Sequence, residues 1–108
     1  MPKKPGPLEV AWSPLALARL QEIRAFVALD KPDAAERLAT RIVSVVEALR
    51  IHPYLGRVGP EPGMRELIII PPRELRLTQG GGAPYSILHR VRANRLIIST
   101  ISHASQSR

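Results

Sequence analysis

The sequence predicts an α+β fold: an N-terminal strand and an antiparallel helical hairpin packed on a largely antiparallel sheet of three to four strands, in the order β-α-α-β-β-β. Two observations lead to this prediction. Residues 14–29 and 32–51 repeat apolar side chains every three or four positions, which is the spacing of one helix face. Residues 64–101 instead hold short aliphatic runs separated by proline and glycine, the pattern of strands. A helical pair followed by strands indicates a helical layer on one face of an antiparallel sheet.

The first helix follows a short apolar stretch, residues 10–12, that is expected to form the N-terminal strand. Ser13 is a favourable N-cap because its hydroxyl can accept a hydrogen bond from an unpaired N–H of the first turn. Pro14 fits the first helical position, where its missing N–H costs nothing. The apolar stripe of this helix runs to about Leu29 and consists of Ala16, Leu20, Ile23 and Val27.

The second helix is expected to start at Pro32, because the residue before a proline leaves the helical region. Asp33 then lies near the positive end of the helix, where a negative charge is favourable. The helix continues to Ile51 and stops before Pro53, and its stripe consists of Ala35, Leu38, Ile42, Val45 and Leu49. Since the link between the helices is so short, the two must lie antiparallel as a hairpin.

The residues after the helices predict one loop and three strands. Residues 52–63 contain three prolines and three glycines and are expected to form the loop. Strands are predicted at residues 64–70, 85–91 and 96–101, and residues 73–77 could resume the first of them. The stretch QGGGAP indicates a flexible turn. The last two strands are joined by a tight turn at Ala93-Asn94, where asparagine tolerates a left-handed conformation.

The length of 108 residues allows one domain. We expect a flexible N-terminal segment at residues 1–8, a single domain at residues 9–105 and a C-terminal tail at residues 106–108. The start, MPKKPGPLEV, has no apolar stretch of the length of a signal peptide, and no stretch approaches a membrane span. A cytoplasmic protein that does not bind a membrane is therefore expected.

The composition argues against metal and disulfide chemistry. There is no cysteine, which excludes disulfides and thiolate metal sites. The three histidines, His52, His89 and His103, do not have the spacing of metal ligands. We therefore expect no metal site and no cofactor.

Positive charge is concentrated in the second half of the chain. Of the net charge of +7, residues 55–108 contribute eight arginines against three acidic residues, whereas residues 1–54 hold eight basic against six acidic residues. Arginine without lysine favours bidentate contacts to phosphate or carboxylate. One interpretation is a solvated basic face; the other is an acidic partner, either a nucleic acid or an acidic protein.

Several motifs, in order, resemble the RelE/ParE superfamily of bacterial toxins. The segment WSPLALARLQEI resembles the opening of these toxins, and KPDAAERLATRIVSVVEALRIHPYLGRVGPEPGMREL is similar to the second helix and following strand of the ParE branch. PYSILHRVRANRLIISTISHA resembles the last hairpin, and the similarity spans residues 9–105. The chain departs from the family pattern in two places: residues 70–82 are longer than usual, and His89 occupies a position where tyrosine is common.

The resemblance implies a toxin of a type II toxin–antitoxin pair, which forms a hetero-oligomer with a small antitoxin encoded beside it. It also implies two possible targets, since the RelE branch cuts messenger RNA in the ribosome and the ParE branch blocks DNA gyrase. A degenerate toxin that is kept only as a partner-binding module is a third possibility.

Metal-independent RNA cleavage needs a base, an acid and cations that hold the phosphate. Glu66 and His103 are candidates for proton transfer, and Arg65, Arg90, Arg92 and Arg95 are candidates for the cations. For a nuclease, Arg65, Arg90 and His103 are the expected catalytic residues. However, no aromatic residue follows His103, and Tyr85, the one aromatic of the three strands predicted after the helices, is more often a packing residue than a stacking platform.

An arginine-rich sheet edge without a convincing acid–base pair favours a toxin that acts by binding. The sequence is therefore interpreted as a ParE-like gyrase inhibitor that is neutralised by a ParD-like antitoxin, with a ribosome-dependent mRNA endonuclease as the alternative. The expected target-binding residues are Arg90, Arg92, Arg95 and His103.

The antitoxin is expected to bind the outer groove of the helical hairpin and the sheet edge, where apolar residues exceed what one core can hide. The candidate contact residues, expected off the main core stripes, are Ala16, Leu17, Val43 and Val46. The alternative is that these four residues form an ordinary edge of the core.

Overall fold

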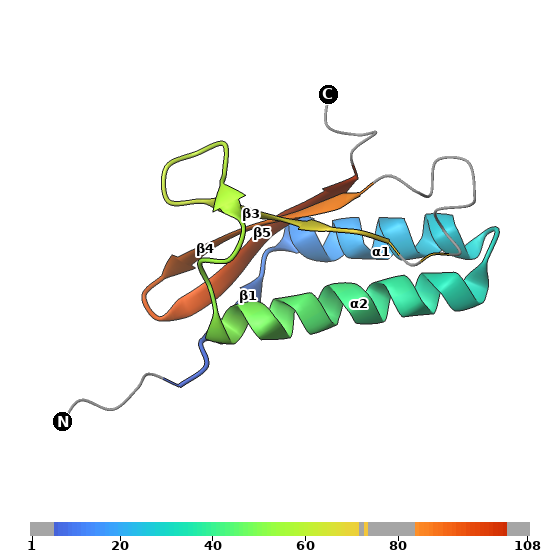
Figure 1. Ribbon diagram of the computed structural model, residues 1–108. Helices are drawn as coiled ribbons and strands as arrows, with labels where there is room; N and C mark the ends of the chain where they lie inside the picture. The colour runs from blue at the N-terminus through green and yellow to red at the C-terminus, as the bar shows by residue number, and fades with distance from the viewer. Residues whose placement is uncertain (1–5, 72, 74–83, 104–108) are drawn as a thin grey trace.

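The computed structural model describes residues 6–71, 73 and 84–103, which form two helices and five strands (Figure 1). In chain order these are β1 (Glu9–Trp12), α1 (Pro14–Ala28), α2 (Pro32–Ile51), β2 (Arg57–Val58), β3 (Arg65–Ile69), β4 (Tyr85–Arg92) and β5 (Arg95–His103). Most of the predicted continuation of β3 at residues 73–77, the glycine-rich turn before Pro84 and the C-terminal tail lie outside the described residues, as does most of the N-terminal segment.

The strands form one mixed sheet with the order β1-β5-β4-β3-β2. β1 pairs with β5 in parallel, and the other neighbours are antiparallel. The predicted α+β class and order of elements are confirmed. The sheet has one strand more than predicted, because Arg57 and Val58 pair with Glu66 and Arg65 inside the stretch that was expected to be a loop. A strand of two residues has no alternation that a sequence pattern could reveal.

The β4–β5 hairpin has the predicted tight turn and one irregularity. Ala93 and Asn94 have φ values of 50° and 65°, the left-handed conformation that a two-residue hairpin turn requires. The pairing then shifts, because His89 faces Ile98 while Leu88 faces Thr100. Ser99 is thus the extra residue of a β-bulge. Before the bulge the even-numbered residues of β5 face the helices, and after it the odd-numbered residues do. Leu96 and Ile98 lie on the buried face before the bulge, and Ile101 and His103 lie on it after the bulge.

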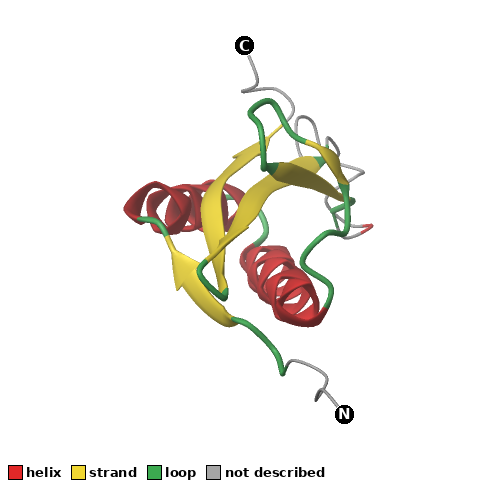
Figure 2. Cartoon of the chain, turned by 90° about the vertical axis from the view of Figure 1, so that its left-hand side faces the viewer, coloured by secondary structure: helices red, strands yellow, loops and turns green. Residues whose placement is uncertain are grey.

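Both helices cover one face of the sheet, and Figure 2 shows the strands twisting across them. The core consists of aliphatic residues of both helices and of β3, β4 and β5, together with the aromatic residue Tyr85. The predicted stripe of α2 is confirmed at Ala35, Leu38, Ile42 and Leu49. It is wrong at Val45, which is half-buried, since Val46 takes the core position. Within the described residues, neither helix has the length and apolar composition needed to cross a lipid bilayer.

Ser13 joins the start of α1 to the bulge of β5. Its hydroxyl oxygen accepts a hydrogen bond from the Ala16 N–H at 2.9 Å, as expected of an N-cap, and donates to the Ser99 carbonyl at 2.7 Å. The Ser13 N–H donates to the Ile98 carbonyl at 3.0 Å. One side chain therefore satisfies an orphan donor of the helix and an acceptor that the bulge leaves outside the ladder.

Replacing this serine should destabilise the domain. Ser13→Ala is expected to lower the free energy of unfolding by about 1–2 kcal/mol, because the cap and the bulge carbonyl both lose their partner. Urea denaturation measures the loss. Ser44→Ala, at an exposed position of α2, serves as the control and should change the stability by less than about 0.5 kcal/mol. Equal stability of the two variants would contradict this role for Ser13.

Candidate functional site

The three residues expected to form a nuclease centre do not converge. Arg65 pairs with buried His89, so its side chain is on the helix-facing side of the sheet. His103 pairs with buried Tyr85 on the same side, whereas Arg90 lies on the opposite, outer face. Tyr85 and Arg90 are five residues apart on β4, which corresponds to about 17 Å along the strand. A phosphate held by Arg90 would therefore be out of reach of the His103 ring.

Glu66 lies on the outer face, on the other side of the sheet from His103. Arg57 donates a hydrogen bond from Nε to Glu66 Oε1 at 2.9 Å. Partial burial of Glu66 disfavours its charge, but hydrogen bonds from Arg57 and Ser86 together with the charge of Arg57 outweigh this and hold its pKa below 4.5. Glu66 is therefore ionised at neutral pH and has no proton to donate to a leaving group.

His103 is a packing residue in this structure. Only 8% of its surface is exposed, and its ring lies edge-on to the Tyr85 ring at a centroid distance of 4.8 Å. The bulge at Ser99 causes this placement, because it turns His103 toward the helix-facing side. A buried side chain cannot touch a macromolecular target directly. The expectation that His103 contacts the target does not agree with its burial.

Three of the expected target-binding residues, Arg90, Arg92 and Arg95, lie together at the β4–β5 turn. Arg92 and Arg95 are cross-strand partners that flank the turn, and Arg90 lies two residues away on the same outer face. Two of these arginines have acidic neighbours: Arg90 Nη2 lies 3.4 Å from Glu61 Oε1, and Arg95 Nε lies 3.7 Å from Glu9 Oε1. Among the described residues, Arg92 makes no ion pair. We call Arg90, Arg92 and Arg95 the arginine tip.

The exposed boundary between α1 and α2, here called the seam, contains two of the four candidate antitoxin contacts. Arg24 of α1 donates to Glu36 of α2 at 3.0 Å, so these two positions lie side by side in the antiparallel pair of helices. Leu17 and Val43 each lie seven residues from this pair, two helical turns away on the same side, so they are opposite each other. Their side chains are 47% and 44% exposed. Both can therefore contact a partner.

The other two candidates are not at the surface. Ala16 is 0% exposed and Val46 is 1% exposed, so the expectation that they lie off the core stripes is wrong. Ala16 is four and seven residues from Leu20 and Ile23 and therefore shares their face. Val46 follows Ile42 by four positions and takes the place that was assigned to Val45.

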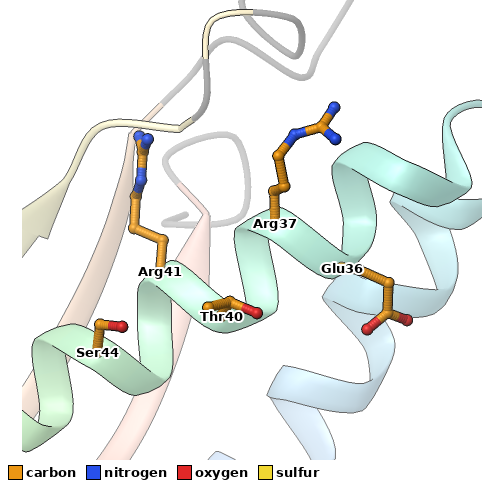
Figure 3. Close-up of a pocket in the computed structure, with 5 residues that line it drawn as sticks. All are labelled: Glu36, Arg37, Thr40, Arg41 and Ser44. Atoms are coloured by element: carbon orange, nitrogen blue, oxygen red, sulfur yellow. The ribbon is translucent and has the colours of Figure 1, made fainter.

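A shallow groove of about 470 Å³ runs along another side of α2, lined by Glu36, Arg37, Thr40, Arg41 and Ser44. Figure 3 shows Arg37 and Arg41 extending from the helix in the same direction, while Glu36 points toward α1. Arg41 donates from Nη1 to the Ile70 carbonyl at 2.8 Å and so ties the end of β3 to α2. In residues 6–71, 73 and 84–103, no three histidine, aspartate or glutamate side chains are placed to hold a metal ion.

His89 is fully buried and holds the loop after α2 against the sheet. Its Nε2 lies 3.1 Å from the Pro53 carbonyl oxygen and its Nδ1 lies 3.4 Å from the Ile87 carbonyl oxygen. Burial lowers the pKa of His89 below 6.5, and the charge of Arg65 acts in the same direction, although the neighbouring backbone carbonyls oppose the shift. The folded chain thus favours the neutral form of the His89 ring.

The stability of the domain should therefore depend on pH below 6.5. The unfolded chain takes up a proton at His89 at a higher pH than the folded chain does, so the free energy of unfolding should decrease as the pH falls from 6.5 through the lower folded pKa. Urea midpoints between pH 7.5 and pH 5 measure this. His89→Gln, whose amide can donate to the Pro53 carbonyl but does not titrate, should flatten the dependence. An unchanged slope would contradict this assignment.

Exposed side chains of the loop after α2 were not predicted as functional. Tyr54 is 65% exposed and Leu55 is 46% exposed. In contrast, most large apolar residues of the preceding helix, α2, are buried. Residues 52–56 belong to the stretch that the sequence predicts as a loop, and the structure has a turn at Pro53 and Tyr54. A large aromatic residue within such a turn is the signal that could have identified this surface, since turns are usually built from small polar residues.

The family model of the ParE toxin of the type II toxin–antitoxin system parDE matches residues 10–108. A putative toxin, Y4kP, from Sinorhizobium fredii is 36% identical over 97 residues, which cover 90% of this chain and 88% of that protein. Toxin RelE2 from Caulobacter vibrioides is 33% identical over 84 residues, which cover 78% of this chain and 90% of that protein.

A solved structure of the chromosomal ParDE toxin–antitoxin system from P. aeruginosa has the same fold. It matches with a TM-score of 0.69 and 24% identity, covering 89% of this chain and 95% of that chain. The match of the family model over nearly the whole domain, together with the two relatives, establishes the family. The chain belongs to the ParE family of toxins of type II toxin–antitoxin systems, within the RelE/ParE superfamily.

Proposed function

We propose that this toxin arrests growth by binding DNA gyrase and that it acts without cleaving RNA. The observation that carries the proposal is the separation of the nuclease candidates: Arg90 lies on the outer face of the sheet, and Arg65 and His103 lie on the helix-facing side. General acid–base catalysis requires the acid and the base within hydrogen-bonding reach of one substrate. Ionised Glu66 does not supply the missing acid.

The arginine tip supports a target that is bound through charge. Arg92 and Arg95 face each other across the turn, and like charges in directly opposite positions destabilise a hairpin. An acidic partner surface would remove this cost on binding. Electrostatic complementarity of this kind raises the association rate and orients the partner.

We further propose that a ParD-like antitoxin neutralises the toxin by covering the seam between α1 and α2. The solved ParDE system from P. aeruginosa, which has the same fold, is a toxin–antitoxin pair. Leu17 and Val43 are exposed, apolar and opposite each other on the hairpin, which is the surface that an amphipathic helix of a partner would cover.

The first test is expression without an antitoxin. Induced expression of the toxin alone should arrest the growth of a bacterial host, and co-expression with its antitoxin should restore growth. Normal growth with folded, soluble toxin accumulating in the cells would support the alternative of a degenerate toxin.

His103→Ala distinguishes the binding mechanism from the nuclease. We expect it to reduce toxicity less than tenfold, because the ring is buried against Tyr85 and the acid candidate Glu66 lies on the other face of the sheet. Removal of a general base would lower the rate by about 10²–10⁴. Growth curves at graded inducer levels measure the effect, and His103→Phe, which keeps an aromatic ring against Tyr85, controls for packing. Complete loss of toxicity in both variants, with the fold intact, would support the ribosome-dependent mRNA endonuclease.

A further inference from the structure

We infer that an exposed apolar patch, formed by the last residue of α2 and the segment that follows it, binds an acidic protein surface and provides much of the affinity for the target. The patch consists of Ile51, Tyr54, Leu55 and Val58, and we call it the loop patch. These side chains are 62%, 65%, 46% and 75% exposed, within eight consecutive residues. Apolar side chains that gather in this way on a small soluble protein usually mark an interaction site.

The loop patch is held in a fixed conformation. The Leu55 N–H donates to the His52 carbonyl at 3.2 Å, and His89 lies against the Pro53 carbonyl. Gly56 has a φ of +99°, and a Cβ at this position would lie 2.5 Å from the Glu66 carbonyl oxygen, so the loop approaches β3 as closely as glycine alone allows. A surface that is already ordered loses little conformational entropy when it binds.

The loop patch lies at the same end of the molecule as the arginine tip. Pro53 contacts His89, the residue before Arg90, and Val58 pairs with Arg65, which in turn pairs with His89. Arg57, within the patch sequence, has a side chain that is 69% exposed. In Figure 1 the end of α2 and the β4–β5 turn both lie at the left, and Figure 2 faces this end.

The chemistry of this end fits an acidic protein better than a nucleic acid. Three aliphatic side chains, Ile51, Leu55 and Val58, cannot read base edges or hold phosphates, but they can enter an apolar depression of a protein. Tyrosine and arginine are the residue types that most often dominate the energy of protein–protein interfaces. The arginine tip would then pair with carboxylates at the rim, where charges set orientation and association rate.

This inference extends the proposed function, because it assigns the loop patch to the surface that contacts the target. It requires an acidic protein target but does not require that the target be gyrase. The two ideas can therefore fail separately.

The test compares two double variants with the parent toxin. The variant Tyr54→Ser/Leu55→Ser changes the loop patch, and Phe26→Ser/Leu29→Ser removes two side chains that are 69% and 86% exposed at the opposite end of the hairpin. All four positions are exposed, so both variants should fold, which circular dichroism and thermal unfolding check. The readouts are growth arrest on expression without an antitoxin, inhibition of purified gyrase and binding to a duplex DNA oligonucleotide.

We expect the loop-patch variant to need at least about tenfold more toxin for growth arrest and for gyrase inhibition, corresponding to about 1.4 kcal/mol of binding energy. The control variant should change both by less than twofold. Full toxicity of the loop-patch variant, or equal losses in both variants, would overturn the inference. Loss of DNA binding in parallel with toxicity would overturn the assignment to a protein partner. If the parent arrests growth without inhibiting gyrase, the proposed target is wrong. A loss of growth arrest in the loop-patch variant alone would still support the inference in that case.

Discussion

Ile42→Ala is expected to lower the free energy of unfolding by about 2–5 kcal/mol, the usual cost of removing most of a buried aliphatic side chain. Ile42 is 0% exposed in the middle of α2, and its neighbour on the stripe, Leu38, is 1% exposed. The total stability of a small domain is about 5–15 kcal/mol. A single truncation at this position therefore removes a large share of it, and Leu38→Ala should have a similar effect.

Val43→Ala is the matched control for this experiment. Val43 follows Ile42 on α2, but its side chain is 44% exposed, so truncation should change stability by less than about 1 kcal/mol. Urea or thermal unfolding of the three variants, each freed from antitoxin, compares the values directly. Equal stability of Ile42→Ala and the parent would show that the buried face of α2 is wrongly assigned.

Neutralising the arginine tip should abolish most of the toxicity in steps. Each of Arg90→Gln, Arg92→Gln and Arg95→Gln is expected to reduce toxicity modestly, and the triple variant should reduce it strongly, because each charge contributes part of one electrostatic surface. The fold should survive, since the contacts of Arg90 with Glu61 and of Arg95 with Glu9 are surface ion pairs. Such pairs contribute about 0–1 kcal/mol each. Inhibition by the parent should also weaken as salt screens the charges.

A control with the same change in net charge separates this local effect from a general one. Arg19→Gln/Arg24→Gln/Lys31→Gln alters three basic residues of α1 and of the link to α2, away from the β4–β5 turn, and should leave toxicity in the absence of antitoxin within about twofold. Complete loss of activity from Arg90→Lys or Arg65→Lys alone, with RNA fragments in cells that express the parent, would contradict the binding mechanism. Lysine keeps the positive charge but loses the bidentate contacts of the guanidinium group. This loss weakens the binding of a transition state more than it weakens a general electrostatic attraction.

The helical layer could be predicted because its signals are local. Ser13 and Pro14 mark the start of α1, and Pro32 marks the start of α2, as observed. The error between Val45 and Val46 has a physical cause: both follow Ile42 at helical spacing, and packing against the sheet decides which of them is buried. The same spacing argument correctly placed Leu38 and Ile42 in the core.

The outer face of the sheet was only partly predictable. The turn at Ala93-Asn94 determines that Arg92 and Arg95 are partners, and this was expected from the sequence. The bulge at Ser99 was not, because the residue that binds its carbonyl, Ser13, lies 86 residues earlier in the chain. Without the bulge, alternation in β5 would place His103 on the outer face, so its burial could not be inferred from sequence.

The ion pairs of the arginines are also beyond sequence reasoning. Arg90 reaches Glu61 across 29 positions, and Arg57 reaches Glu66 from a strand that was not predicted. These contacts decide how much of the positive charge remains for a partner. Counting charges alone overstates the positive charge that is available to a partner. Of the three residues of the arginine tip, only Arg92 has no acidic neighbour among the described residues.

Supercoiling of relaxed plasmid DNA by purified gyrase, measured with increasing amounts of this toxin, tests the binding mechanism most directly. A translation reaction with the same toxin preparation, in which the length of the message is followed, runs in parallel. We expect supercoiling to stop in proportion to the toxin added while the message stays intact. Undisturbed supercoiling, together with cleavage of translated messages, would contradict the proposal that this ParE-family toxin acts by binding gyrase.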